Sequence, residues 1–72
     1  MLQKVFTREE IENLVDIHAD YDWEYAEVII DDDGEGSITL FSTPEERGNQ
    51  PATGWFRADD PEYANLVAEM RK

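Results

Sequence analysis

Hydrophobic and polar residues alternate along two runs in the middle of the chain, within residues 23–43. The runs are separated by an acidic turn, Asp-Asp-Asp-Gly-Glu-Gly, which contains two glycines. Alternation at a period of two residues predicts half-buried strands, and such a turn between them predicts a β-hairpin. The residues expected on the buried face are Ala26, Val28, Ile30, Ile38 and Leu40.

The register of this hairpin follows from the shared face of its aliphatic residues, because a shift of one residue would turn a whole strand over. An odd loop, of residues 33–35 or 32–36, pairs Ile30 with Ile38 and Val28 with Leu40. A two-residue turn is the commonest structure for Asp-Gly, but here it would place aliphatic residues opposite polar ones. We therefore predict the odd loop, with a glycine supplying a positive φ.

Helices are predicted on both sides of the strands. Thr7 as N-cap and Glu10 three residues later form a capping box, and Asp60 followed by Pro61 marks the start of a C-terminal helix. Each segment then carries a stripe at helical spacing. The stripes are Ile11, Leu14, Val15 and His18 in the first segment, and Tyr63, Leu66, Val67 and Met70 in the second.

A third strand is predicted at residues 54–58, after a long loop at residues 43–54 that contains two prolines and two glycines. The expected fold is therefore α+β, with the element order α-β-β-β-α, a small antiparallel sheet and both helices on its aliphatic face. With 72 residues the chain should form a single small acidic domain, residues 1–72. A domain of this size has a narrow stability margin.

Composition limits the partners and the compartment. Eighteen acidic residues against six Lys and Arg give a formal net charge of −12, which repels nucleic acid phosphates and anionic membranes. The first ten residues lack the long apolar core of a signal peptide or membrane span, and the chain contains no cysteine. We expect a soluble, cytoplasmic protein that binds neither nucleic acid nor membranes directly.

The first predicted helix carries its acids on the side opposite the apolar stripe. Two of them, Asp16 and Asp20, would lie toward the negative end of the helix dipole, and acids at i, i+4 repel each other. Stability alone would favour lysine there, although a solvated outer face also explains the acids. We predict a partner-binding surface formed by this stripe and continued by the hairpin turn: Glu9, Glu12, Asp16, Asp20, Asp31, Asp32, Asp33 and Glu35.

Aromatic residues offer an alternative contact surface. Alternation extended from the first strand places a group of large side chains on the sheet face opposite the aliphatic one, where they would be open to a partner. These residues are Trp23, Tyr25, Ile29 and Phe41. The competing interpretation is that so small a chain folds its tryptophans into its own core.

Residues that carry catalysis are scarce. His18 is the only histidine, and the sequence has no glycine-rich phosphate loop and no nucleophile motif. The acidic turn resembles the start of an EF-hand calcium loop, but Ser42 stands where the final Glu ligand would be. We therefore expect no enzymatic activity, no cofactor and no metal site.

In its small size, its excess of acids and its predicted element order, the chain is similar to virus-encoded DNA-mimic inhibitors of restriction and CRISPR nucleases. This resemblance implies a basic, nucleic-acid-binding protein partner whose groove the acids would occupy in place of phosphates. It rests on no family motif and assigns no residues. Two alternatives stay open: a structural or adaptor module that homodimerises or binds a partner through the aromatic face, and adaptation to high salt.

Overall fold

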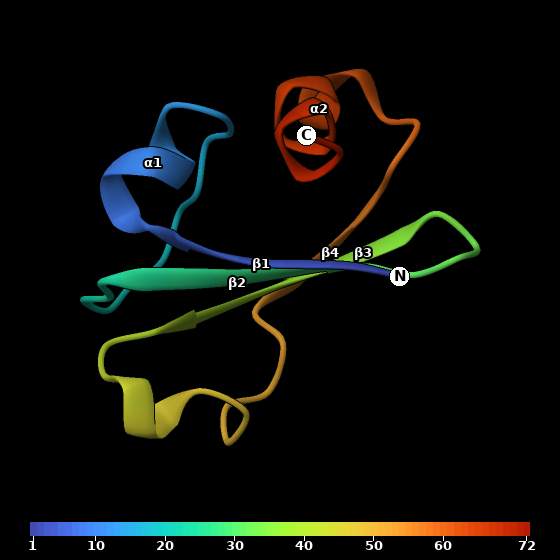
Figure 1. The fold of residues 1–72 in the computed structure, drawn as a ribbon. Helices are drawn as coiled ribbons and strands as arrows, with labels where there is room; N and C mark the ends of the chain where they lie inside the picture. Colours follow the sequence, from blue (N-terminus) through green and yellow to red (C-terminus); the bar gives the residue numbers. More distant parts are fainter.

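Four antiparallel strands form one sheet in chain order, and two short helices lie on one side of it (Figure 1). The structure, a computed structural model, describes all residues from 1 to 72. Neither helix has the length and the hydrophobicity that crossing a membrane requires. The elements are β1 (Leu2–Thr7), α1 (Arg8–Glu12), β2 (Tyr25–Ile30), β3 (Glu35–Phe41), the 3-10 turn η1 (Pro44–Glu46), β4 (Gly54–Arg57), the 3-10 turn η2 (Pro61–Tyr63) and α2 (Ala64–Met70).

The chain starts with a strand, so the element order is β-α-β-β-β-α and the predicted order α-β-β-β-α is wrong at its beginning. β1 pairs antiparallel with β2 along its full length. The strand was not predicted because Lys4 interrupts the apolar face between Leu2 and Phe6. At this edge of the sheet the Lys4 ammonium lies over the Phe6 ring, 5.1 Å from its centroid, and 4.0 Å from the Glu69 carboxylate, so its charge stays near the surface.

The first helix begins where it was predicted. The Thr7 hydroxyl accepts a hydrogen bond from the Glu10 N–H at 3.3 Å, and the Glu10 carboxylate accepts one from the Thr7 N–H at 2.9 Å, which confirms the capping box. The hydrogen bond from the Thr7 backbone is the main reason that the pKa of Glu10 is lowered. The helix ends at Glu12, however, and residues 13–24 follow without regular secondary structure.

The early end of α1 follows from the pairing of β1 with β2. Because Thr7 lies opposite Tyr25, the intervening chain must return to the place where it left the sheet. A helix continued through residue 20 would be about 20 Å long, and the residues left to return would span at most about 17 Å when fully stretched. The predicted stripe is therefore only partly formed: Ile11 and Val15 are buried, Leu14 is half-buried and His18 is exposed.

The hairpin of β2 and β3 has the predicted buried face but different partners across the strands. Its aliphatic side chains all lie on the side covered by the helices and are buried. Val28 lies opposite Ile38 rather than Leu40, and Ile30 lies opposite Gly36. The predicted pairing is thus wrong by two residues, an even shift that leaves every side chain on the predicted face.

Asp31 accounts for the observed register. Its Oδ1 accepts hydrogen bonds from the N–H groups of Asp33 and Glu35, both at 2.9 Å, and its own N–H donates to the Glu35 carbonyl at 2.9 Å. These bonds close an odd loop of residues 31–35, and Gly34 in it has a φ of 83°. The odd loop and the positive φ of a glycine are confirmed, whereas the position of the loop could not be read from aliphatic spacing.

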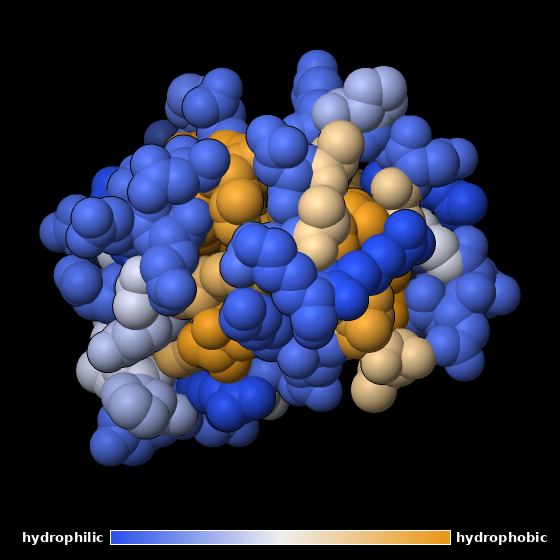
Figure 2. Space-filling view, turned by 45° about the horizontal axis from the view of Figure 1, so that its top comes forward, coloured by the Kyte–Doolittle hydropathy of each residue, from blue (hydrophilic) through white to orange (hydrophobic).

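The hydrophobic core fills the space between the sheet and the helices. Ile11 of α1 and Leu66, Val67 and Met70 of α2 belong to one buried cluster with the aliphatic face of the strands. Asp60 begins the C-terminal helical segment as predicted, and its Oδ1 accepts from the N–H two residues later at 3.0 Å. From the helix side the surface is mainly hydrophilic, with hydrophobic atoms visible only between the polar groups (Figure 2).

Gly36 is required by the close packing of a phenylalanine on the sheet. It lies beside Phe56 of β4, whose ring covers the glycine, so that a Cβ at residue 36 would overlap the ring. Stacking on Tyr63, with centroids 4.6 Å apart, keeps the ring from moving aside. We expect Gly36→Ala to lower the free energy of unfolding by about 1–3 kcal/mol in urea or thermal melts. Gly54→Ala is the matched control, because nothing lies within 4 Å of its Cβ; equal losses in both variants would contradict this packing.

The face away from the helices is partly covered by the loop after β3, residues 42–53 (Figure 1). Glu27 lies on this face and is only 8% exposed. Its Oε2 accepts from Gln3 Nε2 at 2.7 Å and from Arg47 Nε and Nη2 at 3.0 and 2.9 Å. Burial raises the pKa of Glu27, but the hydrogen bonds from Gln3 and Arg47 and the Arg47 charge outweigh burial, so the pKa lies below its ordinary value of 4.5. The ion pair therefore holds the loop against the sheet.

Removing this ion pair should weaken the fold in a pH-dependent way. Because folding lowers the Glu27 pKa, the carboxylate stabilises the protein above pH 4.5, and this contribution is lost as the pH falls through the folded-state pKa. We expect Arg47→Met to lower the free energy of unfolding by about 1–3 kcal/mol at neutral pH. Glu27→Gln should also be less stable than the parent at neutral pH, and the difference should shrink in melts below pH 4.5. A difference that stays constant down to about pH 3 would contradict this assignment.

Candidate interaction surfaces

Residues 9–24, which lead from α1 to β2, carry an unbalanced set of carboxylates and are called the acidic segment below. The segment contains no Lys or Arg. Its acids are all exposed: Glu9, Glu10, Glu12, Asp16, Asp20, Asp22 and Glu24. The four acids predicted as one helical stripe lie in this segment, but Asp16 and Asp20 follow the end of the helix. They therefore do not lie at the negative end of a helix dipole, and that prediction is wrong.

Two acids of the segment have partners within the chain. Glu10 closes the capping box, and Glu12 lies 3.5 Å from Arg8. Arg8 is also held over the Trp23 ring, 4.7 Å from its centroid, and donates to the Trp23 carbonyl at 3.3 Å. The other acids of the segment, Glu9, Asp16, Asp20, Asp22 and Glu24, have no ion pair and no side-chain hydrogen bond. Their charge is not neutralised within the protein.

Shallow depressions lie beside the acidic segment. One, of about 550 Å³, has Glu9, Glu12 and Glu24 in its wall, and the other, of about 440 Å³, has Glu12, Asp16 and Glu62. Pockets for small organic ligands are mostly apolar. The first depression is lined mainly by polar and charged residues, Arg8 among them, and three of the seven residues of the second are hydrophobic, so neither is a mostly apolar pocket.

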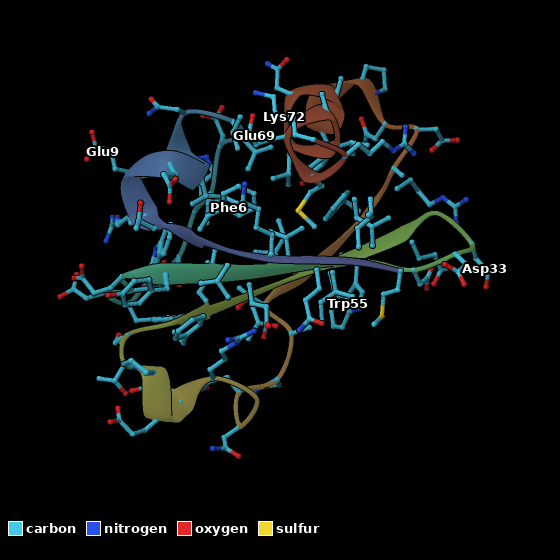
Figure 3. All side chains as sticks on the ribbon, viewed as in Figure 1. Phe6, Glu9, Asp33, Trp55, Glu69 and Lys72 are labelled. Carbon is cyan, nitrogen blue, oxygen red and sulfur yellow. The ribbon has the colours of Figure 1, made fainter.

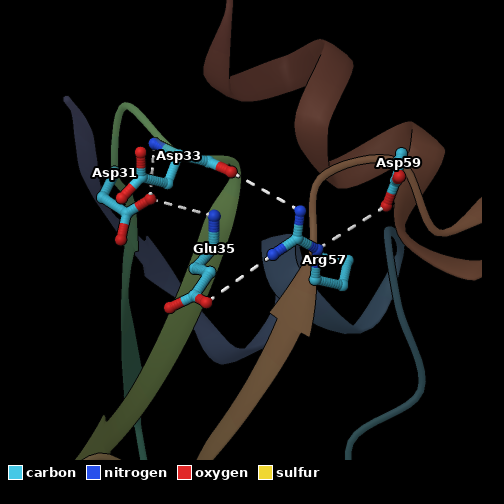
Figure 4. Close-up of polar contacts among 5 residues, drawn as sticks. All are labelled: Asp31, Asp33, Glu35, Arg57 and Asp59. Carbon is cyan, nitrogen blue, oxygen red and sulfur yellow. Dashed lines mark hydrogen bonds and ion pairs between the residues drawn. The ribbon is translucent and has the colours of Figure 1, made fainter.

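The acids of the β2–β3 turn are mostly engaged in local contacts. Asp31 accepts the turn hydrogen bonds, and Glu35 lies 3.6 Å from Arg57, which also approaches Asp59 at 3.9 Å (Figure 4). Asp32 accepts a hydrogen bond from the N-terminal amine at 2.6 Å, and this bond lowers the pKa of Asp32. Only the Asp33 carboxylate has no partner in this group.

The acids predicted as one surface thus form two groups at opposite ends of the sheet. Figure 3 shows Glu9 at the end where α1 lies and Asp33 at the tip of the hairpin. The six residues of β2 separate the two groups by about 20 Å. The acids of the first helical segment therefore do not form one surface with those of the turn, which are Asp31, Asp32, Asp33 and Glu35.

The predicted aromatic patch is also divided. Trp23 is 1% exposed and belongs to the core on the helix side, because the irregular backbone before β2 breaks the strand alternation. Phe41 is 4% exposed and stacks on Tyr25, with centroids 5.4 Å apart. Ile29 is half-buried. For Trp23 the core interpretation is confirmed, and the four side chains do not form one exposed patch.

The most exposed aromatic residue is instead Trp55 in β4, at 73%, followed by Tyr21 of the acidic segment at 54%. Its side chain lies on the side of the sheet away from the helices (Figure 3). Sequence reasoning did not select it, although alternation within β4 carries the signal. Phe56 points into the core, so its neighbour must point to the other face.

Candidate catalytic groups are not brought together. His18 is exposed at the end of the incomplete stripe. No group of three or more His, Asp or Glu side chains in the chain is arranged to hold a metal ion.

Comparisons with protein-family models, with curated proteins and with solved structures found no match to this chain. What the protein does must be inferred from its own residues, foremost the exposed carboxylates of the acidic segment.

Proposed function

We propose that the protein is a small acidic binding protein whose acidic segment occupies the basic, nucleic-acid-binding groove of a protein partner in the cytoplasm. The observation that carries the proposal is that five exposed carboxylates of the segment have no partner within the chain. Such carboxylates stay hydrated and attract a cationic surface over distance. The net charge of −12 makes that attraction stronger for any basic protein.

The carboxylates would take the place of phosphates. B-DNA carries a charge about every 1.7 Å along its axis, and proteins that bind it present Lys and Arg to the backbone. An acidic protein surface that binds such a groove excludes DNA from it. The function is then inhibition of the partner's nucleic acid binding, as in the virus-encoded DNA-mimic inhibitors that the chain resembles, and it requires no catalysis.

The aromatic sheet face supports the alternative, a homodimer or adaptor, less well. Trp23 and Phe41 are 1% and 4% exposed and so are not available to a partner. Two copies that each carry a charge of −12 also repel each other on approach. Adaptation to high salt makes a different prediction, because a halophilic fold unfolds when salt is removed; thermal melts at low and high salt test it.

Capture of a partner on the immobilised protein tests the proposal. We expect a basic protein from a host lysate to bind at about 50 mM salt and to be released at about 200 mM, because screening weakens the attraction. The recovered protein should itself bind double-stranded DNA or RNA. Recovery of a protein that binds no nucleic acid, or one retained equally at both salt concentrations, would argue against the proposal.

A further inference from the structure

β4 forms a free edge of the sheet, with only β3 paired to it. The Ala58 N–H donates to the Gly34 carbonyl at 2.8 Å, and hydrogen-bonded pairs recur at every second position of an antiparallel ladder. The backbone groups of Trp55 and Arg57 therefore face away from β3. The Arg57 carbonyl accepts from the Asp60 N–H at 3.0 Å, which leaves the Trp55 N–H and carbonyl and the Arg57 N–H for an added strand.

The Trp55 side chain lies at this edge and is open to contact by a partner. It is 73% exposed and lies opposite the small residue Ser37 on the face away from the helices. Free edges in monomeric proteins are commonly protected by charged residues or proline. At the edge formed by β4, Trp55 instead presents an indole ring, whose face attracts the cationic side chains of Lys and Arg.

The surroundings of Trp55 are negative. Glu35 and Asp60 share a depression with Trp55, and a second depression at the end of β4 brings Asp33, Asp59 and Arg71 beside Arg57, so four carboxylates face two bases. The only base within the strand, Arg57, is already engaged by Glu35, Asp59 and the Asp33 carbonyl (Figure 4). An added strand therefore meets a surplus of carboxylates, which favours a basic sequence.

We propose that β4 is the docking edge for an extended, basic segment of the partner protein, which adds to the sheet as a fifth strand and places a Lys or Arg side chain against the Trp55 indole. Addition of a strand to a sheet edge supplies backbone hydrogen bonds, and the side-chain contacts supply the preference. A second copy of this chain is disfavoured by its charge of −12. The inference rests on the proposed function only for the positive charge of the partner.

A synthetic peptide of alternating Lys and Thr tests this edge. In an NMR titration of the intact protein we expect the amide signals of Trp55 and Arg57 to shift, while those of Gln3 and Val5 on the opposite edge stay in place. The peptide with Glu in place of Lys should not bind. The same Lys peptide N-methylated at its Lys residues should lose binding, because a Lys opposite Trp55 in an antiparallel strand donates its backbone N–H to the Trp55 carbonyl. No shift in β4 at saturating Lys peptide, or unchanged binding after N-methylation, would overturn the proposal.

Variants separate the Trp55 contact from general attraction. Trp55→Ala should weaken peptide binding about fivefold through loss of the cation–π contact, and Trp55→Phe should restore part of it. Equal affinity of Trp55→Ala and the parent would overturn the role of the indole. Sedimentation without peptide should show a monomer; a dimer that Trp55→Ala abolishes would assign the edge to a second copy instead.

The proposal for the acidic segment and the proposal for the β4 edge can be tested separately. Glu9→Lys combined with Glu24→Lys changes two acids of the segment that line the depression beside α1, to which β4 does not contribute, and should leave the peptide-induced shifts at Trp55 in place. If those shifts occur but the double variant binds the captured partner as tightly as the parent, the acidic segment is not the contact and the edge stands. If the double variant loses the partner but no peptide perturbs β4, the edge proposal alone is wrong.

Discussion

Val28→Asp is expected to unfold the protein. Val28 has no exposed surface and lies in β2 opposite Ile38, within the core beneath the helices. An aspartate there has no basic partner, and an unpaired buried charge costs about 3–5 kcal/mol in addition to the lost packing. The core of a domain this small rarely supplies more than about 5 kcal/mol of stability. Far-ultraviolet circular dichroism and thermal melting should therefore find little or no cooperative folding.

Trp55→Asp provides the matched control. It places the same charged residue in a strand of the same sheet, but at a position that is 73% exposed. Substitutions at such surface positions usually change stability by less than about 0.5 kcal/mol, so the melting temperature should stay close to that of the parent. A Val28→Asp protein that melts with the parent would contradict the assignment of Val28 to the buried face.

Asp16→Lys combined with Asp20→Lys is expected to weaken binding of the captured partner about tenfold or more at low salt, mainly by slowing association. Neither carboxylate has an ion pair, so the reversal breaks no contact within the chain. Each Asp→Lys substitution raises the net charge by 2, so the double variant has a net charge of −8 instead of −12. The fold should be retained, because a smaller net negative charge reduces the repulsion among the carboxylates of this small domain.

Two single variants separate the place of the charge from its amount. Asp16→Lys and Glu45→Lys make the same change in net charge, both at carboxylates without ion pairs, but Glu45 lies in η1, outside the acidic segment. Stopped-flow or surface-binding kinetics should show a much smaller effect on association for Glu45→Lys than for Asp16→Lys. Equal effects of the two variants would mean that the partner responds only to net charge.

Features of the fold that depend on neighbouring residues were predictable from the sequence. The capping box of Thr7 and Glu10 and the cap at Asp60 each need residues within three positions, and the buried face of the hairpin follows from alternation. The β1 strand and the end of α1 were not predictable in this way. Both depend on the pairing of Thr7 with Tyr25, eighteen positions later, which forces the chain to turn back.

The candidate surfaces were predictable only in part. Composition indicated the acid surplus, but which acids lack partners depends on contacts such as Arg8 with Glu12 and the N-terminal amine with Asp32. The two tryptophans illustrate the same limit. Trp23 turns into the core where the backbone is irregular, and Trp55 is exposed because Phe56 takes the core position in β4.

Competition between the protein and DNA for the captured partner tests the central claim most directly. A labelled duplex bound to the partner is titrated with the parent protein, and the anisotropy of the label reports its release. We predict that the protein displaces the duplex competitively, more effectively at about 50 mM than at about 200 mM salt, and that the variant with Lys at positions 16 and 20 requires a much higher concentration. A ternary complex, in which the partner holds the duplex and the protein together, would contradict the claim that the acidic segment occupies the nucleic-acid-binding groove.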